Sequence, residues 1–148
     1  MLKPIRTLLV GAVQYTISDE EKDVVNARYI SSGSMAMREG TICRGRAVGD
    51  TSNGFPGDYV IQYFDVDGVL AGEYDWRIEP VGDCFRLTWR ARPGEDRLPS
   101  EPGDVLYEGF GFPNSERSIV VAYWFTEQLS AAMEAKYAAR AEAAQPAA

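Results

Sequence analysis

A set of aromatic residues is the feature of this sequence best suited to chemistry. They alternate with polar residues along three runs between positions 57 and 91, and again near position 120. This alternation is typical of half-buried antiparallel strands, so the aromatic side chains share one buried face. Hydroxyl and indole N–H groups on apolar walls are typical of pockets for flat or hydrophobic molecules. The residues expected to face inward are Tyr59, Tyr63, Tyr74, Trp76, Phe85, Trp89 and Tyr123.

Glu108 is the second candidate, and two orientations of its strand stay open. In the first, Glu108 lies on an otherwise apolar inner face, where desolvation would raise the pKa of its carboxyl group and allow acid–base work. Glu108, Tyr59 and Tyr63 are then the candidate catalytic residues. In the second, Tyr107 and the glycines after it point inward, and Glu108 lies in water.

Arginine and the absence of histidine limit the remaining chemistry. Arg44 and Arg46 flank a glycine on a predicted strand, and either is a candidate inward anchor for an anion, with a surface position as the alternative. The sequence has no histidine, which excludes Ser-His-Asp and Cys-His systems and histidine-ligated metals. Cys43 and Cys84 are too few for a disulfide framework or a thiolate metal site. We expect neither metal nor cofactor.

Composition narrows the class of protein. A chain of 148 residues is one domain by default, and a formal net charge of -7 disfavours nucleic acid and anionic membrane surfaces as partners. No apolar run reaches the ~18 residues that a membrane-spanning helix needs. The short apolar stretch near the N-terminus is interrupted at Gln14, Tyr15 and Thr16, so it predicts a first strand rather than a signal peptide. A cytoplasmic location is the expectation.

The elements that must position these side chains are mostly strands. Short turn sequences separate the runs, and closure of so many short strands would remove exposed edges. The sequence therefore predicts an all-β, up-and-down antiparallel barrel of about eight strands over residues 1–125, followed at 126–148 by a C-terminal helix and a frayed tail. The expected strands cover residues 5–17, 24–30, 34–38, 41–48, 59–65, 69–78, 84–91, 105–112 and 118–125.

Two turns predict a strand register. Asp67-Gly68 suits a two-residue type I′ hairpin loop, which needs positive φ at both positions. That loop places Tyr59 opposite Trp76 and Ile61 opposite Tyr74. A second loop at positions 81 and 82 would place Trp76 opposite Leu87, Tyr74 opposite Trp89 and Glu73 opposite Arg90. The aromatic side chains then share one face, and the charged residues between them lie outside.

The segments GDYVIQYF, DGVLAGEYDWRI, GDCFRLTW, YEGFGF and SIVVAYW resemble the avidin-like and lipocalin-like (calycin) small barrels. The resemblance covers a little under half the chain and implies a small molecule bound in the barrel mouth. The same stretch is more faintly similar to phenolic acid decarboxylases, which are cofactor-free barrel enzymes that use a close tyrosine pair with an arginine and a glutamate. Here Tyr59 and Tyr63 are four positions apart rather than two.

The function predicted first is the binding of a small hydrophobic or aromatic molecule inside the barrel. The expected ligand contacts are Tyr74, Trp76, Trp89, Tyr123, Phe85 and Arg46. One alternative is a cofactor-independent cyclase, isomerase or decarboxylase that works by tyrosine and glutamate acid–base chemistry. Another is a protein-interaction module that uses the apolar stripe of the C-terminal helix or an outer face of the barrel, with a homo-oligomer as one possible assembly.

Overall fold

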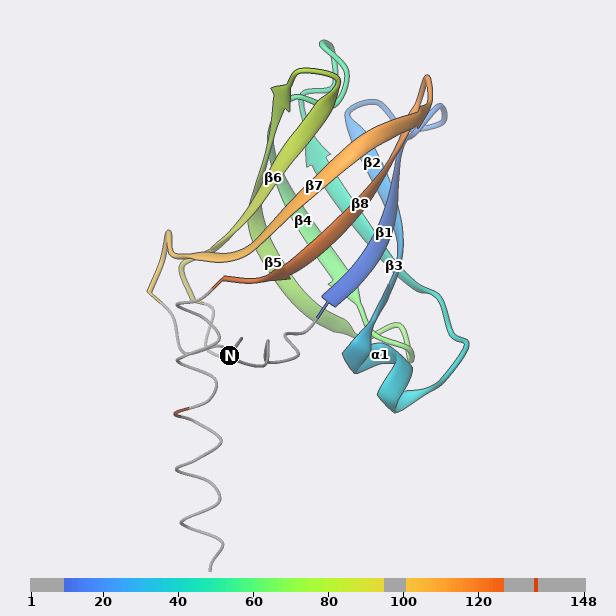
Figure 1. Cartoon of the computed structure of the whole chain (residues 1–148), viewed down its shortest axis with the longest axis vertical. Helices are drawn as coiled ribbons and strands as arrows, with labels where there is room; N and C mark the ends of the chain where they lie inside the picture. The colour runs from blue at the N-terminus through green and yellow to red at the C-terminus, as the bar shows by residue number, and fades with distance from the viewer. Residues whose placement is uncertain (1–9, 95–100, 127–134, 136–148) are drawn as a thin grey trace, which may run out of the picture.

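The chain folds into a closed barrel of eight antiparallel strands, and the strand order in the barrel is the sequence order (Figure 1). This computed structural model describes residues 10–94, 101–126 and 135. Each strand pairs with the next, and β8 pairs with β1 to close the ring. The strands are β1 (Val10–Ile17), β2 (Val24–Ser31), β3 (Cys43–Gly49), β4 (Gly57–Phe64), β5 (Leu70–Val81), β6 (Cys84–Ala91), β7 (Val105–Ser115) and β8 (Ser118–Phe125).

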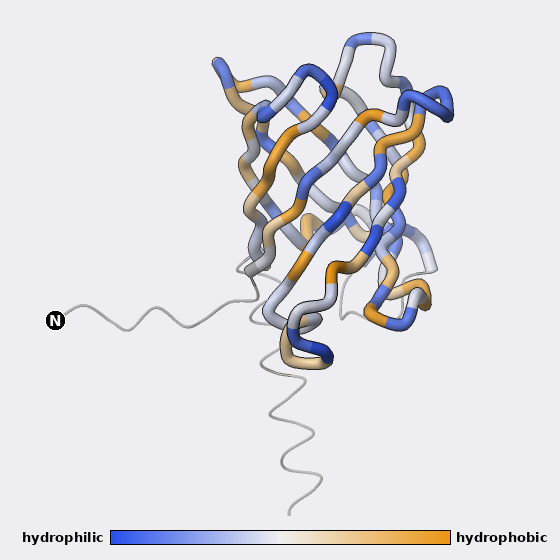
Figure 2. The backbone as a smooth tube through the Cα atoms, turned by 90° about the vertical axis from the view of Figure 1, so that its right-hand side faces the viewer, coloured by the Kyte–Doolittle hydropathy of each residue, from blue (hydrophilic) through white to orange (hydrophobic). Residues whose placement is uncertain are grey.

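Alternation of apolar and polar residues along the strands builds the barrel core (Figure 2). The inward side chains of an eight-stranded barrel meet across an interior just wide enough to be filled or to hold one small ligand. Trp76 lies at the centre of this core, with ring centroids 4.6 Å from Tyr15, 5.1 Å from Tyr59 and 6.2 Å from Trp89. The predicted barrel is confirmed, and its middle is filled.

One expected strand, residues 34–38, is instead a short helix, α1 (Ser32–Met37). Its start is fixed by reciprocal hydrogen bonds. The Ser34 backbone N–H donates to Ser31 Oγ at 3.0 Å, and the Ser31 N–H donates to Ser34 Oγ at 2.9 Å. This capping box satisfies N–H groups that would otherwise lack partners at the helix start, and it ends β2 at Ser31.

The first predicted register is confirmed, although its turn differs. Tyr59 pairs with Trp76 and Ile61 with Tyr74. The loop, however, spans residues 66–68, because the Asp65 N–H donates to the Val69 carbonyl, and Gly68 alone in it has a positive φ, of 78°. A register shift after Tyr63 accommodates the extra loop residue, so the residue pairs further from the loop keep their expected partners.

The second predicted register is wrong by two residues. Trp76 pairs with Trp89 rather than Leu87, and Arg90 lies opposite Asp75 rather than Glu73. The loop is at residues 82 and 83, one position later than expected, because Val81 still pairs with Cys84. A slip of two leaves every side chain on its expected face, so the aromatic residues remain inside.

The charged face of the sheet lies outside, as expected. Arg92 pairs with Asp75 at 2.6 Å and with Glu73 at 3.0 Å, and Arg77 pairs with Asp58 at 3.0 Å. These exposed pairs contribute little stability individually. They keep the outer face of β4, β5 and β6 polar.

The two ends of the barrel differ. At the end that we call the Phe55 end, the connection from β3 to β4 places Phe55 over the opening, 6% exposed and 6.1 Å from the ring of Phe85. The opposite end, which we call the α1 end, carries α1 and the connections from β4 to β5 and from β6 to β7 (Figure 1). The Phe55 end is therefore closed by a side chain.

Two predicted elements, the first strand and the C-terminal helix, extend past the described residues. β1 begins at Val10, so the expected residues 5–9 of the first strand lie outside that range, as does the predicted C-terminal helix apart from residue 135. The last strand, β8, ends at Phe125. Within the described residues, no helix is long and apolar enough to span a membrane.

Candidate functional site

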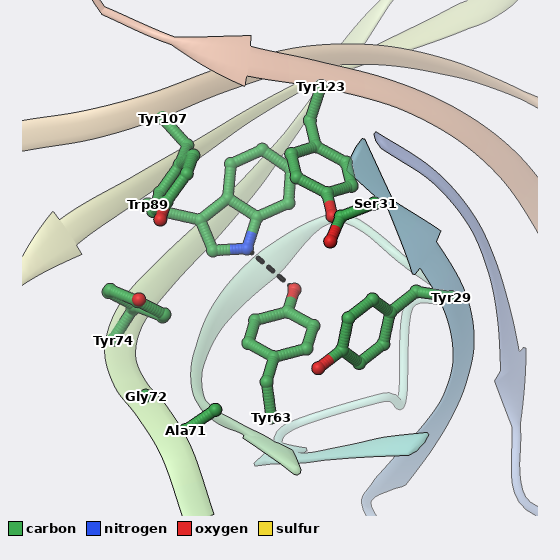
Figure 3. Close-up of a pocket in the computed structure, with 9 residues that line it drawn as sticks. All are labelled: Tyr29, Ser31, Tyr63, Ala71, Gly72, Tyr74, Trp89, Tyr107 and Tyr123. Atoms are coloured by element: carbon green, nitrogen blue, oxygen red, sulfur yellow. Dashed lines mark hydrogen bonds between the residues drawn. The ribbon is translucent and has the colours of Figure 1, made fainter. Parts of the chain in front are cut away.

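A cavity of about 160 Å³ lies inside the α1 end of the barrel (Figure 3). Six strands contribute to its wall, and most of the wall is aromatic. The hydroxyl of Tyr63 is surrounded in this view by rings from the other strands. The described residues that line it are Tyr29, Ser31, Tyr63, Ala71, Gly72, Tyr74, Trp89, Tyr107 and Tyr123.

Three side chains form a hydrogen-bonded chain at the floor of the cavity. Trp89 Nε1–H donates to the Tyr63 hydroxyl oxygen at 2.7 Å, and the Tyr63 and Tyr15 hydroxyl oxygens lie 2.6 Å apart. Tyr15 itself is 1% exposed and lies below the cavity, against Trp76. The chain therefore fixes the position of the Tyr63 hydroxyl from two sides.

The remaining rings form the side walls. Tyr29 meets Tyr63 edge-on, with centroids 5.2 Å apart, and its hydroxyl donates to the Phe64 carbonyl at 2.6 Å. On the other side, Tyr107 meets Tyr74 edge-on at 5.5 Å and Tyr123 at 6.1 Å. Edge-to-face packing of this kind favours defined ring orientations. The walls are therefore held by contacts among themselves.

Glycines in the barrel strands make room for these rings. A Cβ atom on Gly45 would lie 3.0 Å from the ring of Tyr63, and one on Gly72 would lie 2.5 Å from the Tyr74 hydroxyl. A Cβ atom on Gly11 would overlap the ring of Tyr123. Gly45 pairs with Tyr63 and Gly11 with Tyr123, so at these two positions glycine lies opposite tyrosine, a pairing that covers strand backbone with an aromatic ring.

The cavity is electrically neutral at physiological pH. None of the described residues that line it carries a charge. Burial raises the pKa of the Tyr63 and Tyr107 hydroxyls well above the ordinary value of 10.0, and it also raises those of Tyr29 and Tyr123. These hydroxyls therefore keep their protons and offer neutral hydrogen bonds.

Four of the sequence-predicted residues, Tyr63, Tyr74, Trp89 and Tyr123, meet at this cavity. Three others lie inside the barrel but away from it: Tyr59, Trp76 and Phe85. The Tyr59 hydroxyl donates to the Phe55 carbonyl at 2.8 Å at the Phe55 end, where Phe85 also packs. Trp76 is 1% exposed in the filled middle, and its Nε1–H has no hydrogen-bond partner among the described residues.

Glu108 and Arg46 both point outward, so their predicted inward roles are wrong. Glu108 is exposed, and the second orientation considered for its strand is the observed one, with Tyr107 facing inward. Arg46 is exposed and pairs with Glu21 at 2.9 Å. Arg44 is exposed too. Alternation along β3 places Cys43, Gly45 and Ala47 inside and the two arginines between them outside.

Several residues of the site did not enter the prediction: Tyr15 below the cavity, and the lining residues Tyr29, Ser31, Ala71, Gly72 and Tyr107. Tyr15 and Tyr29 each stand at the inward position of an alternating run, two residues after Val13 and Ala27. That signal was present in the sequence. What it lacks is any mark that the side chains of β1 and β2 meet those of β4 and β5 across the barrel interior, because these contacts join distant parts of the chain.

No metal centre accompanies the cavity in the part of the chain that the structure describes, where no group of three or more cysteine or acidic side chains is placed to hold an ion.

Comparison with protein-family models, with curated proteins and with solved structures found no match. The cavity is therefore the feature of this barrel that points to a function.

Proposed function

We propose that this barrel binds a small molecule, of about the size of one six-membered ring, in the cavity at its α1 end. The observation that carries the proposal is the cavity's volume of about 160 Å³ within an otherwise filled barrel. An apolar cavity of roughly 150 Å³ in another protein holds one benzene molecule. A single ring with a small substituent therefore matches the available space.

The lining supports a flat ligand. Five tyrosine rings and one indole surround the space, and stacked or edge-on contacts with such rings stabilise an aromatic guest. A ligand with a polar substituent would also find hydroxyl partners at the floor, near Tyr63. Both features fit the small hydrophobic or aromatic ligand that the sequence predicts.

The likeness to avidin-like and lipocalin-like barrels belongs to the same proposal. Those barrels hold their ligands in the mouth, and the α1 end is the corresponding place here. The phenolic acid decarboxylase likeness finds less support, because Glu108 and Arg46 lie outside the barrel. A tyrosine whose pKa is raised well above 10 stays protonated, donates a hydrogen bond, and is a poor general acid that holds no phenolate to act as a base, so we place binding before catalysis.

The experiment follows the three indole N–H signals by two-dimensional NMR during titration with toluene, phenol and benzaldehyde. Trp89 lines the cavity, Trp76 lies in the filled middle, and Trp124 packs on Phe110 outside the barrel. Binding in the cavity moves the Trp89 signal first and most. Saturable movement of the Trp124 signal alone, or no saturable shift with any of the three compounds, would contradict the proposal.

A further inference from the structure

The Tyr63 hydroxyl can take part in only a limited number of hydrogen bonds. A phenolic hydroxyl donates one hydrogen bond and accepts up to two. An indole N–H can only donate, so the 2.7 Å contact from Trp89 occupies one acceptor site of the Tyr63 oxygen. The direction of the second contact, with Tyr15, decides where the hydrogen of Tyr63 points.

The burial of Tyr15 decides that direction. Tyr15 is 1% exposed, and among the described residues its hydroxyl has one hydrogen-bond partner, the Tyr63 oxygen at 2.6 Å. If Tyr63 donated in this pair, the hydrogen of Tyr15 would be buried without an acceptor, which is strongly disfavoured. Tyr15 therefore donates. Both acceptor sites of Tyr63 are then used, and its own hydrogen is left for the cavity.

We propose that Tyr63 determines ligand specificity by donating this hydrogen to an acceptor atom of an uncharged, one-ring ligand, of which an aryl aldehyde or ketone is the simplest. The inference rests on the proposed function, since it names the class of molecule that the cavity takes. The Tyr63 hydroxyl lies at the floor of the cavity, surrounded by the other lining side chains, and therefore within reach of a bound ring's substituent (Figure 3).

The rest of the cavity favours the same class. The hydrogen of Tyr29 is already given to the Phe64 carbonyl, so Tyr29 offers a ligand lone pairs only. No described lining residue carries a positive charge to balance a carboxylate, and moving an unpaired carboxylate out of water is costly. Moving a neutral carbonyl group out of water costs less free energy, and its oxygen still accepts the hydrogen bond from Tyr63.

The test compares dissociation constants for benzaldehyde, toluene and benzoate, measured from the Trp89 indole signal. In the unmodified protein we expect benzaldehyde to bind about fivefold more tightly than toluene, and benzoate to bind more weakly than either. Tyr63→Phe should abolish the preference for benzaldehyde over toluene. Tyr59→Phe removes a buried tyrosine hydroxyl at the Phe55 end and should keep it.

Tyr15→Phe tests the direction of the hydrogen bond. With Tyr15 as the donor, its removal leaves the Tyr63 hydrogen where it was, and the preference is retained. A marked rise in the preference would mean that Tyr63 had donated to Tyr15, which would overturn the assignment. Circular dichroism shows whether Tyr63→Phe folds. If it does not, the ligand preferences of Tyr15→Phe and of the unmodified protein still decide which tyrosine donates the hydrogen bond.

The outcomes separate the two proposals. If toluene binds but benzaldehyde binds no more tightly, the specificity assigned to Tyr63 is wrong and the binding function stands. Tighter binding of benzoate than of benzaldehyde has the same meaning. If no ring compound shifts the Trp89 signal, the binding function fails, and the inference fails with it.

Discussion

The ring of Tyr123 on β8 lies directly over Gly11 on β1, at paired positions of the seam that closes the barrel. A Cβ atom at position 11 would overlap this ring, so the ring keeps its place because the residue opposite has no side chain. Tyr123 is also a wall of the cavity. The relationship thus links closure of the barrel to the shape of its cavity.

Gly11→Ala should push the Tyr123 ring into the cavity. We expect a loss of about 1–3 kcal/mol in the free energy of unfolding, as is usual for overpacking, together with weaker binding of ring compounds. Urea unfolding and the Trp89 indole titration measure the two effects. Ala12→Ser, at the exposed neighbouring position, is the control and should change stability by less than about 0.5 kcal/mol. Equal losses of stability and ring binding in Gly11→Ala and Ala12→Ser would contradict the close contact between Gly11 and the Tyr123 ring.

Trp76→Phe and Trp89→Phe form a matched pair, because the two side chains are 1% and 2% exposed. Each substitution removes similar volume, but only the Trp89 indole N–H makes a hydrogen bond among the described residues. Trp89→Phe should therefore cost about 1 kcal/mol more in the free energy of unfolding than Trp76→Phe. Urea unfolding followed by circular dichroism measures both. A larger cost at Trp76 would show that its indole has a partner in solution.

Phe55→Ala should open the closed end of the barrel. Its side chain is 6% exposed, and truncation of a buried phenylalanine costs about 3–5 kcal/mol. Phe112→Ala makes the same change at a side chain that is 56% exposed, where we expect less than about 0.5 kcal/mol. Thermal and urea unfolding compare them. Ring binding at the α1 end should survive Phe55→Ala at temperatures where the variant is folded, and its loss there would mean that the two ends are coupled.

Alkaline pH should destabilise the barrel. In the unfolded chain the tyrosines deprotonate near pH 10, whereas burial raises their pKa values in the folded chain, in Tyr59 to about 12. Above pH 10 the unfolded state therefore binds fewer protons than the folded state, and the free energy of unfolding falls as pH rises. The stabilisation is fully present below about pH 10. The residues concerned are Tyr15, Tyr29, Tyr59, Tyr63, Tyr107 and Tyr123.

Urea unfolding at several pH values from about 8 to 11 measures this fall, and ultraviolet absorbance of the phenolate follows the ionisation itself. We expect phenolate to appear together with unfolding, as one steep transition. Gradual ionisation near pH 10 in a barrel that stays folded would show that these hydroxyls are open to solvent.

Glu108→Gln should leave both stability and ring binding unchanged. The side chain is exposed on β7, on the opposite side of the strand wall from the cavity. We expect a stability change within about 0.5 kcal/mol and the same dissociation constant for benzaldehyde. Calorimetric titration checks the second point. A substantial loss of affinity would require Glu108 to reach the interior.

Side-chain alternation predicted which residues lie inside the barrel, but it could not determine every pairing. Moving a two-residue loop by one position changes the strand register by two and leaves all side chains on the same face. This is why Tyr59 opposite Trp76 was predicted correctly while Trp76 opposite Leu87 was not. Patterning alone cannot distinguish such registers, because both bury the same apolar surface.

The failures have local causes. The orientation of Glu108 was ambiguous because Leu106 is an extra residue at the point where β6 and β7 shift register. Leu106 is therefore buried, whereas Glu108, two positions later, is exposed. The helix α1 was missed because its signal is a serine pair, Ser31 and Ser34, rather than a periodic apolar stripe. The cavity itself depends on side chains from six strands, and no single stretch of sequence records how they meet.

The pairing of β1 with β8 has a consequence for the order of folding. Val10 lies opposite Trp124, so the earliest described strand must wait for the last one before the ring is complete. Until β8 pairs with β1 and β7, a strand edge on each side of the seam has no partner, and unpaired edges are prone to pairing with other chains. Contacts so distant in sequence also slow folding. A ring compound present during refolding could therefore reach Tyr63 and Trp89 before Tyr123 arrives, and so become enclosed without passing through the mouth.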